Sequence, residues 1–247
     1  MSVSESMAIL LDKNIWPESL RRNQPSLSTA EQAMLIRSRV AVIGCGGLGG
    51  YLACFCARLG VGSLLLVDND VYDITNMNRQ CLCTGKTLGK NKADITAEYC
   101  QDIHEWIEIR SIAEKITRRN AARLLSGVDL VLDGLDKIAD RFILYEATRR
   151  LRIPFVHGAV MGWSGQTTTF MPETIIGLDA IYPDPKDADN PPSVLAPSPA
   201  IIAALQCQEA LRILTGKKPK NEGSLICYDG EEMCISKLNF SANKKYD

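Results

Sequence analysis

The stretch Arg39-Val-Ala-Val-Ile-Gly44-Cys-Gly46-Gly47-Leu-Gly49-Gly50 decides the fold of this chain. The apolar run at 40–43 predicts a short buried parallel strand, and the residues from Leu48 onward have helical spacing. Gly44, Gly46 and Gly49 fit the pattern G-x-G-x-x-G, which lets the backbone turn sharply between a strand and a helix. The sequence therefore predicts a strand, a tight glycine turn and a helix in immediate succession.

The next apolar run, at 64–67, ends in Asp68 and predicts the second strand of the same unit. Bare backbone N–H groups at a helix N-terminus bind the phosphates of a nucleotide. Asp68 would then accept hydrogen bonds from a ribose hydroxyl. Strand, glycines, helix and acid in this order favour a nucleotide site over a merely tight turn. In the alternative, Asp68 only caps the loop that follows its strand.

The composition limits the class of protein and its partners. The 247 residues contain 28 Lys and Arg against 29 Asp and Glu, and the net charge of −1 indicates no nucleic-acid-binding surface. No apolar run approaches the roughly 18 residues of a membrane span, and the N-terminus is polar and broken by Pro17. Nine cysteines, an odd number, suit a reducing cytosol better than a disulfide framework. We therefore expect a cytoplasmic protein without a membrane or nucleic-acid partner.

Strand and helix patterns alternate along the chain as far as about residue 158. This alternation predicts an α/β fold with a doubly wound, mainly parallel Rossmann-like sheet and helices on both faces. A later strand pattern and a terminal hairpin predict an antiparallel C-terminal extension. Beyond the first unit, helices are expected at 29–38, 90–101, 117–125, 140–151 and 199–215, and strands at 106–110, 128–132, 154–158, 165–170, 225–228 and 233–238.

The chain is expected to divide into three parts. An irregular N-terminal arm at 1–26, with a short helical piece at 18–23, precedes a single domain at 27–240 and a frayed tail at 241–247. Within the domain, residues 171–199 are too rich in proline for a helix or a central strand. They predict a long mobile loop, and loops of this length are usually functional or disordered.

Five motifs stand in a recognisable order: Gly44-Cys-Gly-Gly-Leu-Gly49, Asp68, Asn76-Met-Asn-Arg79-Gln80, Gly89-Lys-Asn-Lys92 and Asp133-Gly-Leu-Asp136. Over roughly residues 18–238 the chain resembles the MoeB/ThiF/HesA adenylyltransferases, the bacterial relatives of ubiquitin-activating enzymes. The resemblance implies an ATP- and Mg²⁺-dependent enzyme that transfers AMP to the C-terminal glycine carboxylate of a small ubiquitin-like sulfur carrier protein ending in Gly-Gly. Pyrophosphate leaves, and a separate sulfur donor then acts on the acyl adenylate in cofactor biosynthesis.

The resemblance also assigns roles to individual residues. A carboxylate must attack the α-phosphorus of a tetra-anion, so positive groups and Mg²⁺ have to cancel the repulsion and stabilise the departing pyrophosphate. Arg79 and Lys92 are expected to hold the phosphates, Asp136 to coordinate Mg²⁺, and Asp68 to bind the ribose. The other residues expected to line the nucleotide site are Gly44, Gly46, Gly47, Gly49, Asp70, Asn76, Gln80 and Leu135.

Residues around the last motif are weaker candidates. Asp133 begins the motif, and Arg141 in the following helix could reach either the carrier's tail or the phosphates. Lys137 stands where the family usually has Asn, which leaves details of the metal and phosphate site open. His157, at a strand end, is interpreted as a packed or hydrogen-bonded residue rather than as a base.

An arginine near the N-terminus is the basis for an expected homodimer. Relatives carry, at a similar distance before the first strand, an arginine that enters the ATP site of the partner subunit. Arg22 is the better candidate for this catalytic role, and Arg21 is the runner-up. In the alternative, the segment is a surface arm.

The cysteines depart from the pattern of the family. Many members bind a structural zinc through two late C-x-x-C pairs, but this chain has no such pair, so no zinc is expected. Residues 101–206 contain no cysteine, so the long loop has no nucleophile. Cys81 and Cys83 are the remaining candidates for acyl or redox chemistry, and Cys45 is interpreted as a small packing residue. We therefore expect the enzyme to stop at the acyl adenylate.

Three other functions compete with carrier adenylation. A NAD-dependent oxidoreductase shares the glycine pattern and Asp68, but it has no use for Arg79, Lys92 and Asp136. A non-catalytic nucleotide-binding scaffold would fit the missing cysteines and Lys137. Within the family, a dehydratase-like branch activates a small acid or a tRNA-bound carboxylate instead of a carrier protein.

Overall fold

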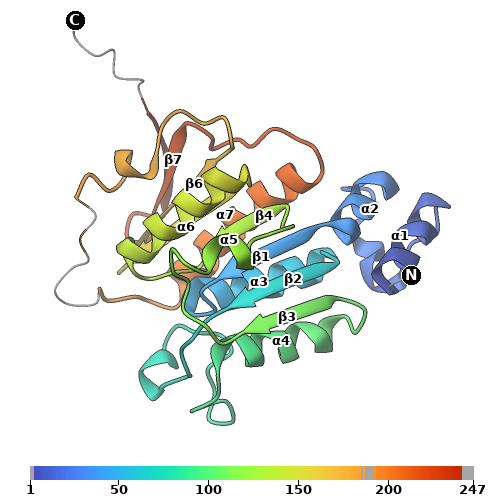
Figure 1. Ribbon diagram of the computed structural model, residues 1–247, viewed down its shortest axis with the longest axis horizontal. Coiled ribbons are helices and arrows are strands. Elements are labelled where there is room, and N and C mark those ends of the chain that lie inside the picture. The colour runs from blue at the N-terminus through green and yellow to red at the C-terminus, as the bar shows by residue number, and fades with distance from the viewer. Residues whose placement is uncertain (1–2, 185, 187–191, 241–247) are drawn as a thin grey trace, which may run out of the picture.

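The computed structural model describes residues 3–184, 186 and 192–240, in which eight strands form one sheet. The strand order is β3-β2-β1-β4-β5-β6-β7-β8 (Figure 1). The strands are β1 Arg39–Ile43, β2 Ser63–Val67, β3 Glu108–Ile112, β4 Leu130–Asp133, β5 Phe155–Met161, β6 Ser164–Phe170, β7 Ser224–Asp229 and β8 Cys234–Asn239.

The sheet has a parallel part and an antiparallel part. Strands β3, β2, β1, β4 and β5 are parallel, whereas β6, β7 and β8 pair antiparallel with their neighbours. The chain leaves β1 toward β2 and β3 and returns to the other side of β1 at β4, so the order reverses between β1 and β4. In open α/β sheets this switch point opens a crevice at the carboxyl ends of the strands, where ligands bind. The predicted fold class is confirmed.

Helices cover both faces of the sheet, as the alternation of strands and helices predicts (Figure 1). One hydrophobic layer joins α3, α4 and α7 to the even-numbered β1 residues Val40 and Val42. The other joins α5 and α6 to Ala41 and Ile43. The helices are α1 Val3–Asp12, α2 Thr29–Arg37, α3 Gly47–Leu59, α4 Lys92–Ile103, α5 Ala121–Leu124, α6 Ile138–Leu151 and α7 Pro197–Leu214, with 3₁₀ turns η1 Glu18–Asn23, η2 Ile74–Asn76 and η3 Leu178–Ala180.

The N-terminal arm is more regular than predicted. The short helical piece is confirmed as η1, but the expectation of an irregular arm is wrong for Val3–Asp12, which form α1. The side chains of Ala8 and Leu11 are fully buried and join the same hydrophobic layer as α2. Helix α2 begins with the predicted capping box, in which Ser28 and Glu31 exchange hydrogen bonds.

The crossover segment, residues 171–196 between β6 and α7, corresponds to the expected loop; the structure describes it except at 185 and 187–191. Its described part packs against the domain, since Leu178 is fully buried and Val194 forms a bridge with Gly162. The predicted tail at 241–247 lies outside the described residues. Among the described helices, none combines the length and the apolarity needed to cross a bilayer.

Candidate nucleotide site

The glycine turn lies at the carboxyl ends of β1 and β4, where Gly44 packs against Gly134. Gly44 has a φ of +87°, a left-handed conformation, and a Cβ there would lie 2.6 Å from the carbonyl oxygen of Gly134. A Cβ on Gly49 would lie 1.7 Å from the carbonyl oxygen of Gly44. Because α3 begins at Gly47, the N–H groups of its first turn have no partner within the helix, an arrangement that binds phosphates. The turn therefore has the geometry of a phosphate site.

Asp68 lies directly beside the glycine turn. Its Oδ2 accepts a hydrogen bond from the Cys45 amide at 2.7 Å, and its Oδ1 accepts one from the Asp70 amide at 2.8 Å. Burial raises the pKa of this carboxyl, while the two backbone hydrogen bonds and Lys92 oppose the rise. The carboxylate thus does cap the loop after its strand. A carboxylate has about four lone-pair positions, so these two hydrogen bonds leave positions for a ribose hydroxyl. That contact stays a prediction.

The loop after β2 lies over the glycine turn. A Cβ on Gly46 would lie 3.5 Å from Nε2 of Gln80, and a Cβ on Gly47 would lie 3.9 Å from Cγ of Arg79. In this structure the Arg79 guanidinium donates from Nη1 to the Thr75 carbonyl and to Oδ1 of Asn78. Buried Asn76 closes the capping box of η2. Arg79 and Gln80 therefore lie against the glycines, and their contacts with a nucleotide stay predictions.

Lys92 is the first residue of α4 and is buried, with 7% of its surface exposed. Its Nζ lies 3.3 Å from Oδ2 of Asp70, whose side chain is largely exposed. An ammonium at the positive end of a helix is unfavourable, so this position needs an anionic partner. Asp70 supplies one such partner, and an ammonium has two further N–H groups to offer a phosphate.

The turn after β4 presents two aspartates in different environments. Asp133 is fully buried, and its Oδ1 accepts a hydrogen bond from the Leu135 amide at 3.0 Å. Asp136 is exposed, and among the described residues it has no hydrogen-bond or ion-pair partner. A Mg²⁺ bound to nucleotide phosphates takes one or two protein carboxylates and fills its other positions with water. The free carboxylate of Asp136 fits that requirement.

The buried side chain of Arg141 makes its contacts within the domain, and its role toward the carrier's tail or the phosphates stays a prediction. Its side chain is buried at 5% exposure; Nη2 donates to the Leu135 carbonyl at 2.5 Å, and Nη1 donates to the Tyr182 hydroxyl at 3.1 Å. Its Nε lies 3.4 Å from Oδ2 of Asp133. The guanidinium therefore binds the protein's own turn. His157 is fully buried and hydrogen-bonded to Asp133 at 2.7 Å, as the sequence predicted for a packed histidine.

Arg22 lies far from the glycine turn of its own chain. It lines a hollow of about 250 Å³ together with Leu59, Arg212 and Lys217. Leu59 is the last residue of α3, whereas the glycine turn lies at the first; thirteen helical residues span about 20 Å. Arg21 forms an exposed ion pair with Glu18 at 3.1 Å. Within one subunit, neither arginine joins the candidate site.

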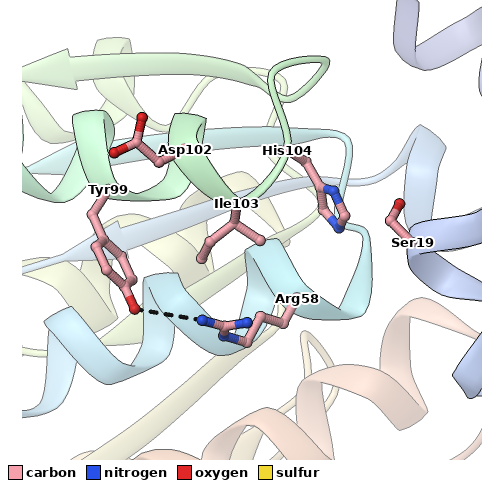
Figure 2. A pocket seen from close by; sticks show the side chains of 6 residues that line it. All are labelled: Ser19, Arg58, Tyr99, Asp102, Ile103 and His104. Atoms are coloured by element: carbon pink, nitrogen blue, oxygen red, sulfur yellow. Dashed lines mark hydrogen bonds between the residues drawn. The ribbon is translucent and has the colours of Figure 1, made fainter.

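A second hollow, of about 540 Å³, also lies away from the glycine turn. Arg58 of α3 borders it, and the Arg58 guanidinium hydrogen-bonds the Tyr99 hydroxyl across it (Figure 2). Its other lining residues are Ser19, Asp102, Ile103 and His104. None of these was predicted for the nucleotide site, and the hollow is at the distal end of α3.

The thiols are poor candidates for covalent chemistry. Cys45 is fully buried inside the glycine turn, and burial raises its pKa. The Cys81 sulfur lies toward Gly50 of α3, and desolvation there raises its pKa to about 11. Burial also raises the pKa of Cys83. Across residues 3–184, 186 and 192–240, no three His, Cys, Asp or Glu side chains gather closely enough to hold a metal ion.

Two polar residues escaped the sequence analysis. Tyr182, in the crossover segment, has a hydroxyl that meets Arg141, His157 and Gln166. Gln206 of α7 donates from Nε2 to the carbonyls of Asp133 and Val156, which bridges β4 and β5. No local sequence pattern marks either contact, because each joins residues far apart in the chain.

Together these features define a nucleotide-binding α/β protein in which cationic side chains and a free carboxylate surround a glycine turn. The model of the ThiF family matches residues 20–247, and the chain belongs to that family. The resemblance to the MoeB/ThiF/HesA proteins is confirmed, and with it the class of enzyme, an ATP-dependent adenylyltransferase.

Proteins with similar sequences carry names of this class. The chain is 29% identical over 217 residues to the SAMP-activating enzyme E1 of Haloferax volcanii, covering 86% of this chain and 80% of that protein. It is 29% identical over 231 residues to the sulfur carrier protein adenylyltransferase of Thermus thermophilus, covering 90% and 85%. It spans about half the length of its relatives named adenylyltransferase and sulfurtransferase MOCS3. The fold matches that of E. coli MccB in its structure with ATP, with a TM-score of 0.79 at 20% identity over 95% of this chain and 74% of that one.

Proposed function

We propose that this chain activates the C-terminal glycine carboxylate of a small ubiquitin-like sulfur carrier protein as an acyl adenylate. The carboxylate oxygen forms a bond to the α-phosphorus of ATP. The bond from that phosphorus to the bridging oxygen breaks, and pyrophosphate leaves with the electron pair. The product is a mixed anhydride that a separate sulfur donor can attack.

The observation that carries this proposal is the set of charges around one glycine turn. Arg79 lies against Gly47, and Lys92 projects from the start of α4 beside Asp70. A hydride-transferring enzyme with a nicotinamide cofactor needs neither cation, whereas a triphosphate needs both. The arrangement therefore favours ATP chemistry over the NAD-dependent alternative.

Asp136 is the residue proposed to hold Mg²⁺. Its exposed carboxylate follows Leu135 in the turn that abuts the glycine loop. When bound, Mg²⁺ neutralises charge on the phosphates and on the departing pyrophosphate. Lys137 stands next to this carboxylate and is also exposed. Its ammonium adds positive charge at the edge where the triphosphate would lie.

The partner proposed here is suggested by the names of two relatives. One is called a SAMP-activating enzyme and the other a sulfur carrier protein adenylyltransferase. The match covers at least 80% of the length of each relative, so the similarity extends over most of both chains. A carrier ending in Gly-Gly is therefore the substrate to test first.

ATP–pyrophosphate exchange tests the proposal directly. Labelled pyrophosphate should enter ATP only when enzyme, Mg²⁺ and a carrier ending in Gly-Gly are all present. A carrier truncated by its last glycine is the matched control and should support no exchange. Exchange with small acids but not with carriers would support the dehydratase-like alternative. Protection of the fold by NAD but not by ATP would contradict the proposal.

We also propose that the enzyme acts as a homodimer in which Arg22 enters the partner's site. The proposal is supported by the place of Arg22 near Leu59 at the last turn of α3, since the glycine turn lies at the other end of that helix, which is about 20 Å long. Mixing Arg22→Ala and Arg79→Ala protomers should restore part of the exchange activity, since one site of each mixed dimer is intact. Arg21→Ala serves as the control. A monomeric mass measured by light scattering under assay conditions would contradict the proposed homodimer.

A further inference from the structure

A closed polar cluster lies where the crossover segment meets the carboxyl end of β4 and the adjacent residues of β5. We call it the Tyr182 cluster: Asp133, Arg141, His157, Gln166 and Tyr182. His157 contacts Oδ2 of Asp133 through Nδ1 at 2.7 Å and the Tyr182 hydroxyl through Nε2 at 3.2 Å. The hydroxyl also meets Nη1 of Arg141 and Nε2 of Gln166, both at 3.1 Å. Asp133 and His157 are fully buried.

The protons of the cluster can be assigned from these contacts. The nitrogens of Arg141 and Gln166 that face the Tyr182 hydroxyl can only donate, so they occupy both of its lone pairs. Its single hydrogen must then point to Nε2 of His157, which has to be unprotonated. Nδ1 therefore carries the imidazole proton and donates to Asp133. Burial lowers the pKa of His157 and raises that of Tyr182, which is consistent with a neutral ring and a neutral phenol.

Two members of the cluster form hydrogen bonds with the backbone of the turn that precedes Asp136. Arg141 donates to the Leu135 carbonyl at 2.5 Å, and Asp133 accepts from the Leu135 amide at 3.0 Å. Both backbone groups of Leu135 are thus held by cluster members. A Cβ on Gly44 would lie 2.9 Å from the Leu135 nitrogen, so the same turn also packs on the glycine loop.

We propose that Tyr182 and His157 are positioning residues that fix the Leu135–Asp136 turn through Arg141 and Asp133. Tyr182 comes from the crossover segment, so its hydroxyl ties that segment to the nucleotide site. Without the hydroxyl, Arg141 and Gln166 lose their acceptor and His157 loses its donor. The two residues that hold the turn, Arg141 and Asp133, are then less firmly fixed, and the carboxylate of Asp136 is less well placed. This inference rests on the proposed function only in assigning Asp136 its role.

A hydroxyl deletion with a matched control tests the proposal. Tyr182→Phe removes the central hydroxyl, while Tyr145→Phe removes another tyrosine hydroxyl, which accepts a hydrogen bond from Arg149 at 3.3 Å outside the cluster. In ATP–pyrophosphate exchange, Tyr182→Phe should lower kcat about tenfold with KM for ATP changed less than twofold, because misplacement of a catalytic group affects the reaction step. Tyr145→Phe should stay within twofold of wild type. An unchanged kcat in Tyr182→Phe would overturn the proposal.

Two measurements test the cluster without the reaction. The chain has only two histidines, so ¹⁵N spectra can assign the His157 tautomer, which should carry its proton on Nδ1. Hydrogen exchange of the Leu135 amide should be at least tenfold faster in Tyr182→Phe than in Tyr145→Phe. A proton on Nε2, or equal exchange in both variants, would refute the cluster. Absence of pyrophosphate exchange in wild type with these results intact would refute the proposed function alone.

Discussion

The turn after β4 carries two aspartates that are partnered in opposite ways, one in the Tyr182 cluster and one in the candidate site. Inside the cluster, Asp133 contacts Arg141, His157 and the Leu135 amide, and it is fully buried. Three residues later, Asp136 is exposed without a partner among the described residues. Buried charge is costly unless it is paired and hydrogen-bonded, so the pairing of Asp133 indicates a structural role. An unpaired group at the mouth of a crevice remains available to a ligand.

The largest expected effect comes from breaking the cluster at its buried charge. Asp133→Ala would leave the Arg141 guanidinium buried without its carboxylate, and removing one partner of such a pair costs about 3–5 kcal/mol. Chemical denaturation should show this loss in the free energy of unfolding. Asp136→Ala is the matched control and should change the free energy of unfolding by no more than about 0.5 kcal/mol. Equal losses in both variants would mean that the two aspartates do not differ as described.

Activity should show the reverse order for the site charges. Lys92→Ala and Asp136→Ala are each expected to lower pyrophosphate exchange by on the order of 10²-fold, the scale for losing a preorganised electrostatic contact. Lys115→Ala is the control, because Lys115 also pairs with an aspartate, Asp140, at 3.0 Å, but its own side chain is half-exposed. Full exchange activity in Asp136→Ala would contradict the metal assignment.

The sequence predicted the parallel half of the molecule well and the cluster hardly at all. The glycine turn, Asp68 and the Asp133–Asp136 motif all follow strands directly, so local pattern and chain order were sufficient to place them. Helix α1 was missed although Ser4, Ala8 and Leu11 recur at helical spacing on its buried side. The run of apolar residues at 7–11 was a further signal for this helix.

The cluster depends on contacts between distant positions. His157 follows Asp133 by 24 residues, and Tyr182 follows Arg141 by 41. No local periodicity encodes such pairs, and the proline-rich surroundings of Tyr182 indicated only a loop. The partners of Arg141 are also remote or outside its helix, since Tyr182 lies in the crossover segment and Asp133 and Leu135 lie at the end of β4 and after it.

A smaller effect should appear in the pH dependence of stability. Burial lowers the pKa of both His157 and His104 below the ordinary 6.5, and Arg58 lowers that of His104 further. The unfolded chain therefore binds protons first as the pH falls through 6.5, and the folded state loses stability below that value. We expect a loss of up to about 1 kcal/mol per pH unit for each histidine. Denaturation between pH 7.5 and 5.5 should show a shallower slope in His104→Gln than in wild type; an unchanged slope would contradict the assignment.

The smallest effect concerns Cys81, the thiol nearest the glycine turn in the β2–α4 loop. With its pKa near 11, the thiolate fraction at pH 7 is roughly a hundredfold below that of an ordinary cysteine, and the thiolate is the reactive form. Alkylation of Cys81 by iodoacetamide, followed by mass spectrometry, should therefore be slow. For the same reason, enzyme, ATP and carrier on a non-reducing gel should give no covalent complex. A thiol-sensitive band that disappears in Cys81→Ala or Cys83→Ala would show that the enzyme continues past the adenylate. It would also require ligand binding to lower a thiol pKa that burial raises in the free protein.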